Sequence, residues 1–172
     1  VPDIVAHLEN ICRQENLQAD PDALHIIAQK ADGALRDALS IFDRIVSAST
    51  NGHVTYNDVI ENLNVLDYDY FFKVTDALLT EDVAGVLRLY DDIMRKGFEG
   101  DLFIEGLASH FRNLLVCKDI DTLVLLEAGE GLRSRYQQQA TLAAMGFVLT
   151  ALNLCNECDI HFKQARNKRL HV

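Results

Sequence analysis

The sequence has few of the residues that break or cross-link a chain. It contains two prolines, nine glycines and four cysteines among 172 residues, and 49% of its residues are hydrophobic. Such a composition is typical of a globular protein, and a chain of this length buries one good core or two small ones. Four cysteines are too few for a disulfide-stapled scaffold, so we expect free thiols and a cytoplasmic location.

Long apolar runs and an excess of positive charge are also missing. The apolar run at residues 123–126 is far shorter than the ~20 residues that a membrane helix requires. The sequence therefore predicts no membrane span. The formal net charge is -10, whereas affinity for DNA or RNA depends mainly on cations that displace phosphate counterions. We therefore expect no free-standing nucleic-acid binder.

The motifs of hydrolysis and metal binding are absent too. No glycine-rich loop precedes a Lys-Ser or Lys-Thr pair, and no apolar strand ends in Asp-Glu, so this stretch alone is not expected to hydrolyse a nucleotide. The six histidines are scattered. Cys155 and Cys158 form a C-x-x-C pair without a second pair, and they lie within a helical pattern, which favours two ordinary cysteines over a metal or redox site. We predict no metal site.

Hydrophobic residues recur with a helical period almost throughout, which predicts an all-α fold. A first helix ends before Glu15, and a second begins at Pro21 with Asp20 as its cap. A third follows Gly33, and Thr55 with Asp58 resembles a capping box that opens a fourth. Residues 53–56 are the best candidate strand but are short, so we predict no strand.

The helical spacing of hydrophobic residues continues through the second half of the sequence. A helix at residues 71–79 is followed by one that starts with Thr80-Glu81-Asp82 and ends at Gly97, and Asp101 is expected to cap the next. Weaker helical signals cover residues 122–127 and 132–140. A long last helix is predicted from about Leu142 to His161. We place a domain boundary near Asn64.

One segment has a functional pattern, Gly-Ala-Leu-Arg-Asp-Ala-Leu-Ser at residues 33–40. It places Arg36 in the first turn of a helix directly after a glycine. The start of a helix has unpaired N–H groups and a partial positive charge, so a guanidinium there adds to a surface suited to phosphate. The alternative from the residues alone is an exposed Arg36 paired with Asp32 or Asp43.

This octapeptide resembles the sensor-2 motif of AAA+ clamp loaders, and its ending from Arg36 to Ser40 is similar to the gamma/tau family of bacterial DNA polymerase III. Related loaders and recombination ATPases more often have an Asp two places before the Arg and an Asn in place of Ser40. The flanking likeness lies in His7-Leu8, Asp22-Ala23-Leu24, Asp43, Ser47, Val65-Leu66-Asp67 and Asp101-Leu102.

The resemblance implies two domains. Residues 1–63 would form the AAA+ lid, and residues 64–172 the collar, or oligomerisation, domain, truncated in a last helix that starts near Arg169. It also implies that Arg36 reaches the γ-phosphate of ATP and that Leu35 flanks the nucleotide. ATP with magnesium would bind in the full-length ATPase, whose AAA+ core lies outside this sequence. We expect no nucleotide bound to this fragment alone.

The partners implied by the resemblance follow the same division. The collar would bind the other clamp-loader subunits, namely gamma/tau, delta and delta-prime. The sliding clamp and primed DNA would be contacted through the AAA+ domains, and no membrane is involved. The activity implied is the coupling of ATP binding and hydrolysis to clamp loading in DNA replication.

Two other classes of protein stay open at this point. In an all-helical transcription regulator, the second and third helices would form a helix-turn-helix. The third helix, however, balances Arg36 and Arg44 with Asp37 and Asp43, whereas a recognition helix should be basic. In a helical adaptor, Arg36 would contact no nucleotide.

Overall fold

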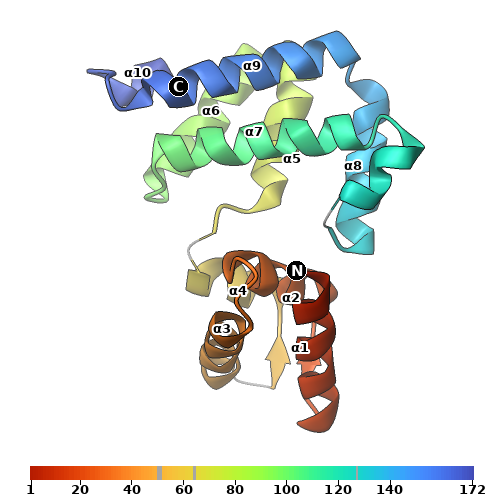
Figure 1. Ribbon diagram of the computed structural model, residues 1–172. Helices are drawn as coiled ribbons and strands as arrows, with labels where there is room; N and C mark the ends of the chain where they lie inside the picture. Colours follow the sequence, from red (N-terminus) through yellow and green to blue (C-terminus); the bar gives the residue numbers. More distant parts are fainter. Residues whose placement is uncertain (50–51, 64, 127) are drawn as a thin grey trace. The chain divides into compact units, whose positions relative to one another are not determined.

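The computed structural model describes residues 1–49, 52–63, 65–126 and 128–172 (Figure 1). Their contacts separate the chain into two compact units. Unit 1 comprises Val1–Val65 and Glu127–Arg133, and unit 2 comprises Leu66–Leu126 and Ser134–Val172. Helices dominate both units, so the predicted all-α class is confirmed.

Among its described residues, unit 1 contains four complete helices, a pair of two-residue strands and residues 130–133, which begin a further helix. The helices are α1 (Pro2–Gln14), α2 (Pro21–Lys30), α3 (Leu35–Ala48) and α4 (Tyr56–Leu63). Strands β1 (Gln18–Ala19) and β2 (His53–Val54) pair in parallel, with Gln18 opposite His53. The prediction of no strand was wrong here, because two-residue strands are too short to show an alternating pattern.

The cap of α2 also differs from the prediction. Asp20 precedes α2, but its side chain makes no capping bond to that helix. Its carboxylate instead accepts the backbone N–H of Tyr56 at 2.9 Å, at the start of α4, and lies 3.1 Å from Nε2 of His53. The backbone N–H of Asp20 donates to the carbonyl of Val54, so strand pairing brings Asp20 to the beginning of α4.

The capping box that was predicted for α4 is confirmed. The backbone N–H of Thr55 donates to Oδ2 of Asp58 at 3.0 Å, and the N–H of Asp58 donates to Oγ1 of Thr55 at 3.2 Å. The hydrogen bonds from Thr55 lower the pKa of Asp58. Two donors at the start of α4 are thereby satisfied by residues only three apart.

Unit 2 is a bundle built around two long helices. Its elements are α5 (Tyr68–Leu79), α6 (Val83–Arg95), α7 (Gly100–Val116), the 3-10 helix η1 (Ile120–Leu125), α8 (Glu130–Leu142) from Ser134 onward, α9 (Met145–Phe162) and α10 (Lys168–His171). Helices α7 and α9 lie side by side (Figure 1). Buried Phe111 and Leu114 of α7 and Val148 and Cys155 of α9 belong to its core.

Local signals set several ends of these helices. Asp82 caps α6 by accepting the N–H of Gly85 at 2.8 Å, and Gly97 follows the helix with a φ of +89°, as predicted. Asp101 was expected to cap α7, but α7 begins one residue earlier, at Gly100. A Cβ at Gly100 would lie 3.0 Å from the Tyr90 hydroxyl and 3.2 Å from the Phe162 ring, so a larger residue would be crowded at the first position of α7.

The predicted last helix is interrupted near its beginning. Helix α8 ends at Leu142 and α9 begins at Met145, and their axes are bent by 110°. No single helix among the described residues is long and apolar enough to cross a membrane; α8 and α9 reach that length only when taken together across this bend.

Candidate functional site

A left-handed turn precedes α3 and sets the position of its first residues. Asp32 has a φ of +46° and Gly33 a φ of +81°. A Cβ on Gly33 would meet no atom within 4 Å, so glycine suits this position for its backbone conformation rather than for lack of space. The turn ends at Ala34, which has extended backbone angles and is the N-cap of α3. Leu35 and Arg36 therefore start the helix.

Arg36 lies on the solvent side of α3. Ala38, Phe42 and Ile45 form the buried side of this helix, whereas Arg36 is exposed. Within the described ranges, its guanidinium has no ion pair or hydrogen bond, and the alternative pairing with Asp32 or Asp43 does not form. The charge of Arg36 is therefore available to a ligand or another domain.

The backbone around Arg36 adds to its positive charge. Ala34 provides no side-chain cap, and its carbonyl accepts the N–H groups of Asp37 and Ala38, each at 3.1 Å. The N–H groups that begin a helix carry partial positive charge, which Asp37 in the same turn offsets in part. Beside Arg36, Leu35 keeps 41% of its surface exposed. An exposed cation and an apolar side chain thus lie next to each other on one turn.

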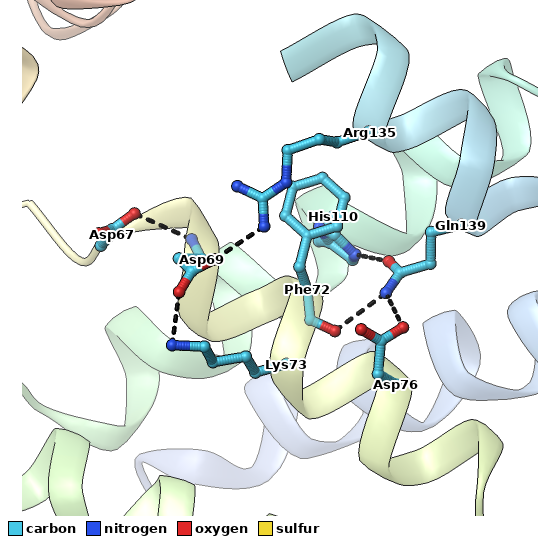
Figure 2. Close-up of polar contacts among 8 residues, drawn as sticks. All are labelled: Asp67, Asp69, Phe72, Lys73, Asp76, His110, Arg135 and Gln139. Atoms are coloured by element: carbon cyan, nitrogen blue, oxygen red, sulfur yellow. Dashed lines mark hydrogen bonds and ion pairs between the residues drawn. The ribbon is translucent and has the colours of Figure 1, made fainter. Parts of the chain in front are cut away.

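A second polar cluster joins three helices of unit 2 (Figure 2). On α5, the carboxylate of Asp69 accepts from Lys73 at 2.6 Å and from Arg135 of α8 at 2.7 Å. The hydrogen bond from Lys73 is the main reason that the pKa of Asp69 is lowered. Asp67 caps α5 by accepting the N–H of Asp69 at 2.9 Å.

The buried part of this cluster is centred on Gln139 of α8. Its amide donates to the carbonyl of Phe72 at 2.9 Å and to Asp76 at 2.7 Å, and its oxygen accepts from Nε2 of His110 at 2.7 Å (Figure 2). Burial lowers the pKa of His110 to about 4, so its ring is neutral at pH 7. Nδ1 of His110 has no hydrogen-bond partner among the described atoms. This cluster fastens helices to one another and offers no reactive group.

The cysteines lie in unreactive surroundings. Cys155 is buried and Cys158 half-buried on α9, and both are free thiols. Burial raises the pKa of Cys155 to about 11 and raises that of Cys158, which disfavours the nucleophilic thiolate. In the part of the chain that the structure describes, no three His, Cys, Asp or Glu residues are grouped to hold a metal ion.

The sequence singled out Leu35 and Arg36, which the structure places together on one exposed turn. It did not reveal the cluster around Gln139. Its members lie up to 67 residues apart along the chain, and no local pattern brings α5, α7 and α8 together. A buried glutamine leaves no periodic signal by which it could have been found.

Two family models match the chain. Residues 3–51 match the ATPase lid domain of the DNA polymerase III clamp loader subunit. Residues 54–158 match domain III of DNA polymerase III subunits gamma and tau. The first match contains the exposed turn with Arg36, and the second contains most of unit 2.

Relatives from several bacteria are similar to the chain. It is 27% identical to DNA polymerase III subunit tau of Bacillus subtilis, with 91% of this chain and 27% of the relative covered. It is 28% identical to subunit gamma/tau of Mycoplasma genitalium, covering 74% and 21%. It is 32% identical to subunit tau of Escherichia coli, covering 67% and 18%. The match therefore spans between 18% and 27% of the length of these relatives.

A solved structure shows the same fold. The clamp loader delta protein of Bacillus subtilis matches 98% of this chain and 52% of its own, with a TM-score of 0.56 at 12% sequence identity. The likeness at this identity concerns the fold alone. The domain III match alone covers more than half of the 172 residues. The chain therefore belongs to the DNA polymerase III gamma/tau family of clamp-loader subunits.

Proposed function

We propose that this chain is the lid and collar part of a gamma/tau clamp-loader subunit. It couples ATP binding and hydrolysis in an AAA+ core to loading of the sliding clamp on primed DNA, in the cytoplasm. Residues 1–63 act as the lid and residues 64–172 as the collar. The family assignment supports this function over the transcription regulator and the adaptor without nucleotide contact.

The observation that carries the proposal is the exposed Arg36 in the first turn of α3, whose guanidinium has no partner among the described residues. Its planar fork of N–H donors matches the oxygens of a phosphate, and the beginning of a helix adds partial positive charge at the same place. ATP bound with Mg²⁺ in the AAA+ core supplies a γ-phosphate that hydrolysis removes. Arg36 binds that phosphate, and Leu35 contacts the nucleotide with its exposed apolar surface.

The lid then responds to the loss of an anion. With the phosphate present, Arg36 ties unit 1 to the core; without it, the guanidinium returns to water and unit 1 is released. A charged contact of this kind contributes about 1.5–3 kcal/mol. That energy is enough to change the balance between two arrangements of the lid by tenfold or more.

The collar proposal is supported by the apolar surface of unit 2. Large hydrophobic side chains that remain exposed in the described ranges include Val83 and Leu87 of α6, Ile120 and Val124 of η1, and Leu149 and Leu154 of α9. Exposed apolar side chains can form contacts in protein association. We propose that this surface binds the other loader subunits, gamma/tau, delta and delta-prime.

The experiment that tests the lid assignment is Arg36→Ala in the full-length protein. Clamp loading driven by ATP should fall by at least about tenfold, since a charged phosphate contact is lost, while the helical circular dichroism stays unchanged. Arg44→Ala is the matched control, because Arg44 is another exposed arginine of α3, two turns further along. Equal loading by wild type and Arg36→Ala would refute the sensor role.

A further inference from the structure

Helix α8 is attached to unit 2 differently from its neighbours. Within its residues 134–142, the buried side chains are Tyr136, Gln139 and Ala140, so Tyr136 is the one large aromatic or aliphatic anchor in that stretch. Helix α7, by contrast, buries Phe103, Ile104, Leu107, Phe111 and Leu114. Burial of apolar surface is the main source of stability. Residues 134–142 of α8 therefore gain less stability from buried apolar surface than α7 does.

Polar contacts make up much of what holds α8 in place. Arg135 bonds to Asp69 at 2.7 Å and lies 4.3 Å from the centre of the Phe72 ring. Gln139 makes three hydrogen bonds, to Phe72, Asp76 and His110 (Figure 2). Each such bond contributes little net free energy, because water offers the same groups an alternative partner.

The two ends of α8 are held differently. Leu126 and residues 128 and 129 before it are not helical, and its junction with α9 is a 110° bend at Ala143 and Ala144. Lys118 donates to the carbonyls of Ala140 and Ala143, which fixes the end of α8 next to this bend. The rest of the helix is linked to α5 and α7 by the contacts of Arg135, Tyr136 and Gln139.

We propose that residues 134–142 of α8 open away from α5 and α7 while α7 and α9 stay folded. This opening breaks the bonds of Gln139 and Arg135 and the bond from Lys118 to the carbonyl of Ala140, and it exposes Phe72 and His110 to solvent. It is a local conformational change of unit 2, and it does not depend on the role of Arg36.

Hydrogen exchange of the whole chain, followed by mass spectrometry, tests this proposal. Amides of residues 136–142 should exchange at least about tenfold faster than those of residues 107–114 and 148–155, as for a helix that opens below the global unfolding limit. Gln139→Ala should speed exchange in α8 by a further factor of about ten, because three hydrogen bonds are lost. Exchange in α7 and α9 should not change.

Gln137→Ala is the matched control, since Gln137 is an exposed glutamine on the same helix. It should leave exchange in α8 within about twofold of wild type. Arg135→Gln removes an exposed guanidinium, and should speed exchange in α8 a few-fold even where Gln139→Ala fails to fold. The proposal is overturned where α8, α7 and α9 exchange at one common rate in wild type, or where Arg135→Gln speeds all three equally.

Discussion

Among single residues, His110 makes the stability of unit 2 depend on pH. Its pKa is about 4 in the folded chain, below the ordinary value of 6.5, because of burial. The unfolded chain therefore takes up the proton first as the pH falls. The contribution of neutral His110 to the free energy of unfolding is therefore fully present above about pH 6.5. It is lost as the pH falls toward 4, with a slope approaching ~1.4 kcal/mol per pH unit. Urea unfolding at pH 7, 6 and 5, followed by tyrosine fluorescence, measures this slope.

His110→Gln separates this effect from other titrations. A glutamine amide can still donate to the oxygen of Gln139 but carries no titratable proton. The variant should be less stable at pH 7. Between pH 7 and pH 5, however, its free energy of unfolding should fall by about 1–2 kcal/mol less than that of the wild type. Parallel curves for the two proteins would assign the pH dependence to other groups.

Gly33 is the residue that lets the chain turn into α3. In Gly33→Ala, the φ of +81° places a Cβ in a left-handed conformation, which should cost about 1–2 kcal/mol although no atom clashes. Gly146→Ala is the matched control, because Gly146 lies in open space without a positive φ, in the first turn of α9. That change should be neutral or stabilising by up to ~1 kcal/mol. Thermal unfolding of both variants measures these changes. Equal destabilisation would show that the positive φ of Gly33 is not the cause.

At the scale of helices and strands, the sequence predicted those features that depend on neighbouring residues. The capping box of Thr55 and Asp58 and the end of α6 at Gly97 each depend on residues within four positions of one another, and both were confirmed. Features that depend on distant packing were missed. Because β1 pairs with β2, Asp20 accepts a hydrogen bond at the start of α4 instead of capping α2.

In the candidate site too, local features could be predicted from the sequence, whereas features of the folded surface could not. The position of Leu35 and Arg36 in the first turn of α3 depends on a glycine only two or three residues away, so the sequence placed them correctly. That Arg36 forms no ion pair with the described residues is a property of the folded surface. The proposed contact between Arg36 and a phosphate stays a prediction.

The hydrogen bond between Asp20 and the start of α4 can itself be tested. Asp20→Ala removes the acceptor for the Tyr56 N–H and the partner of His53, at the junction of β1, α2 and α4. We expect a loss of about 1–2 kcal/mol in the free energy of unfolding. Asp43→Ala, an exposed change within α3, should stay within about 0.5 kcal/mol. Similar values for the two variants in denaturant titrations would show that Asp20 is not an important cap.

For the whole molecule, the two dominant surface properties act in opposite directions. The net charge of -10 makes copies of the chain repel one another, while the exposed apolar side chains of unit 2 favour association. Salt screens the repulsion over a Debye length of about 10 Å at 0.1 M, but it does not weaken apolar contacts. Self-association through the proposed collar surface should therefore strengthen when NaCl is raised from about 20 to about 200 mM.

Sedimentation over a concentration series measures this association. Leu87→Glu and Val124→Glu each place a charge on an apolar surface of unit 2, where these side chains are 63% and 81% exposed, and should weaken association at least about tenfold. Leu35→Glu is the matched control, because Leu35 is an exposed apolar residue of unit 1 and should have no effect. Association that weakens with salt would indicate ion pairs instead, and a monomer under all conditions would mean that other subunits must supply the contacts.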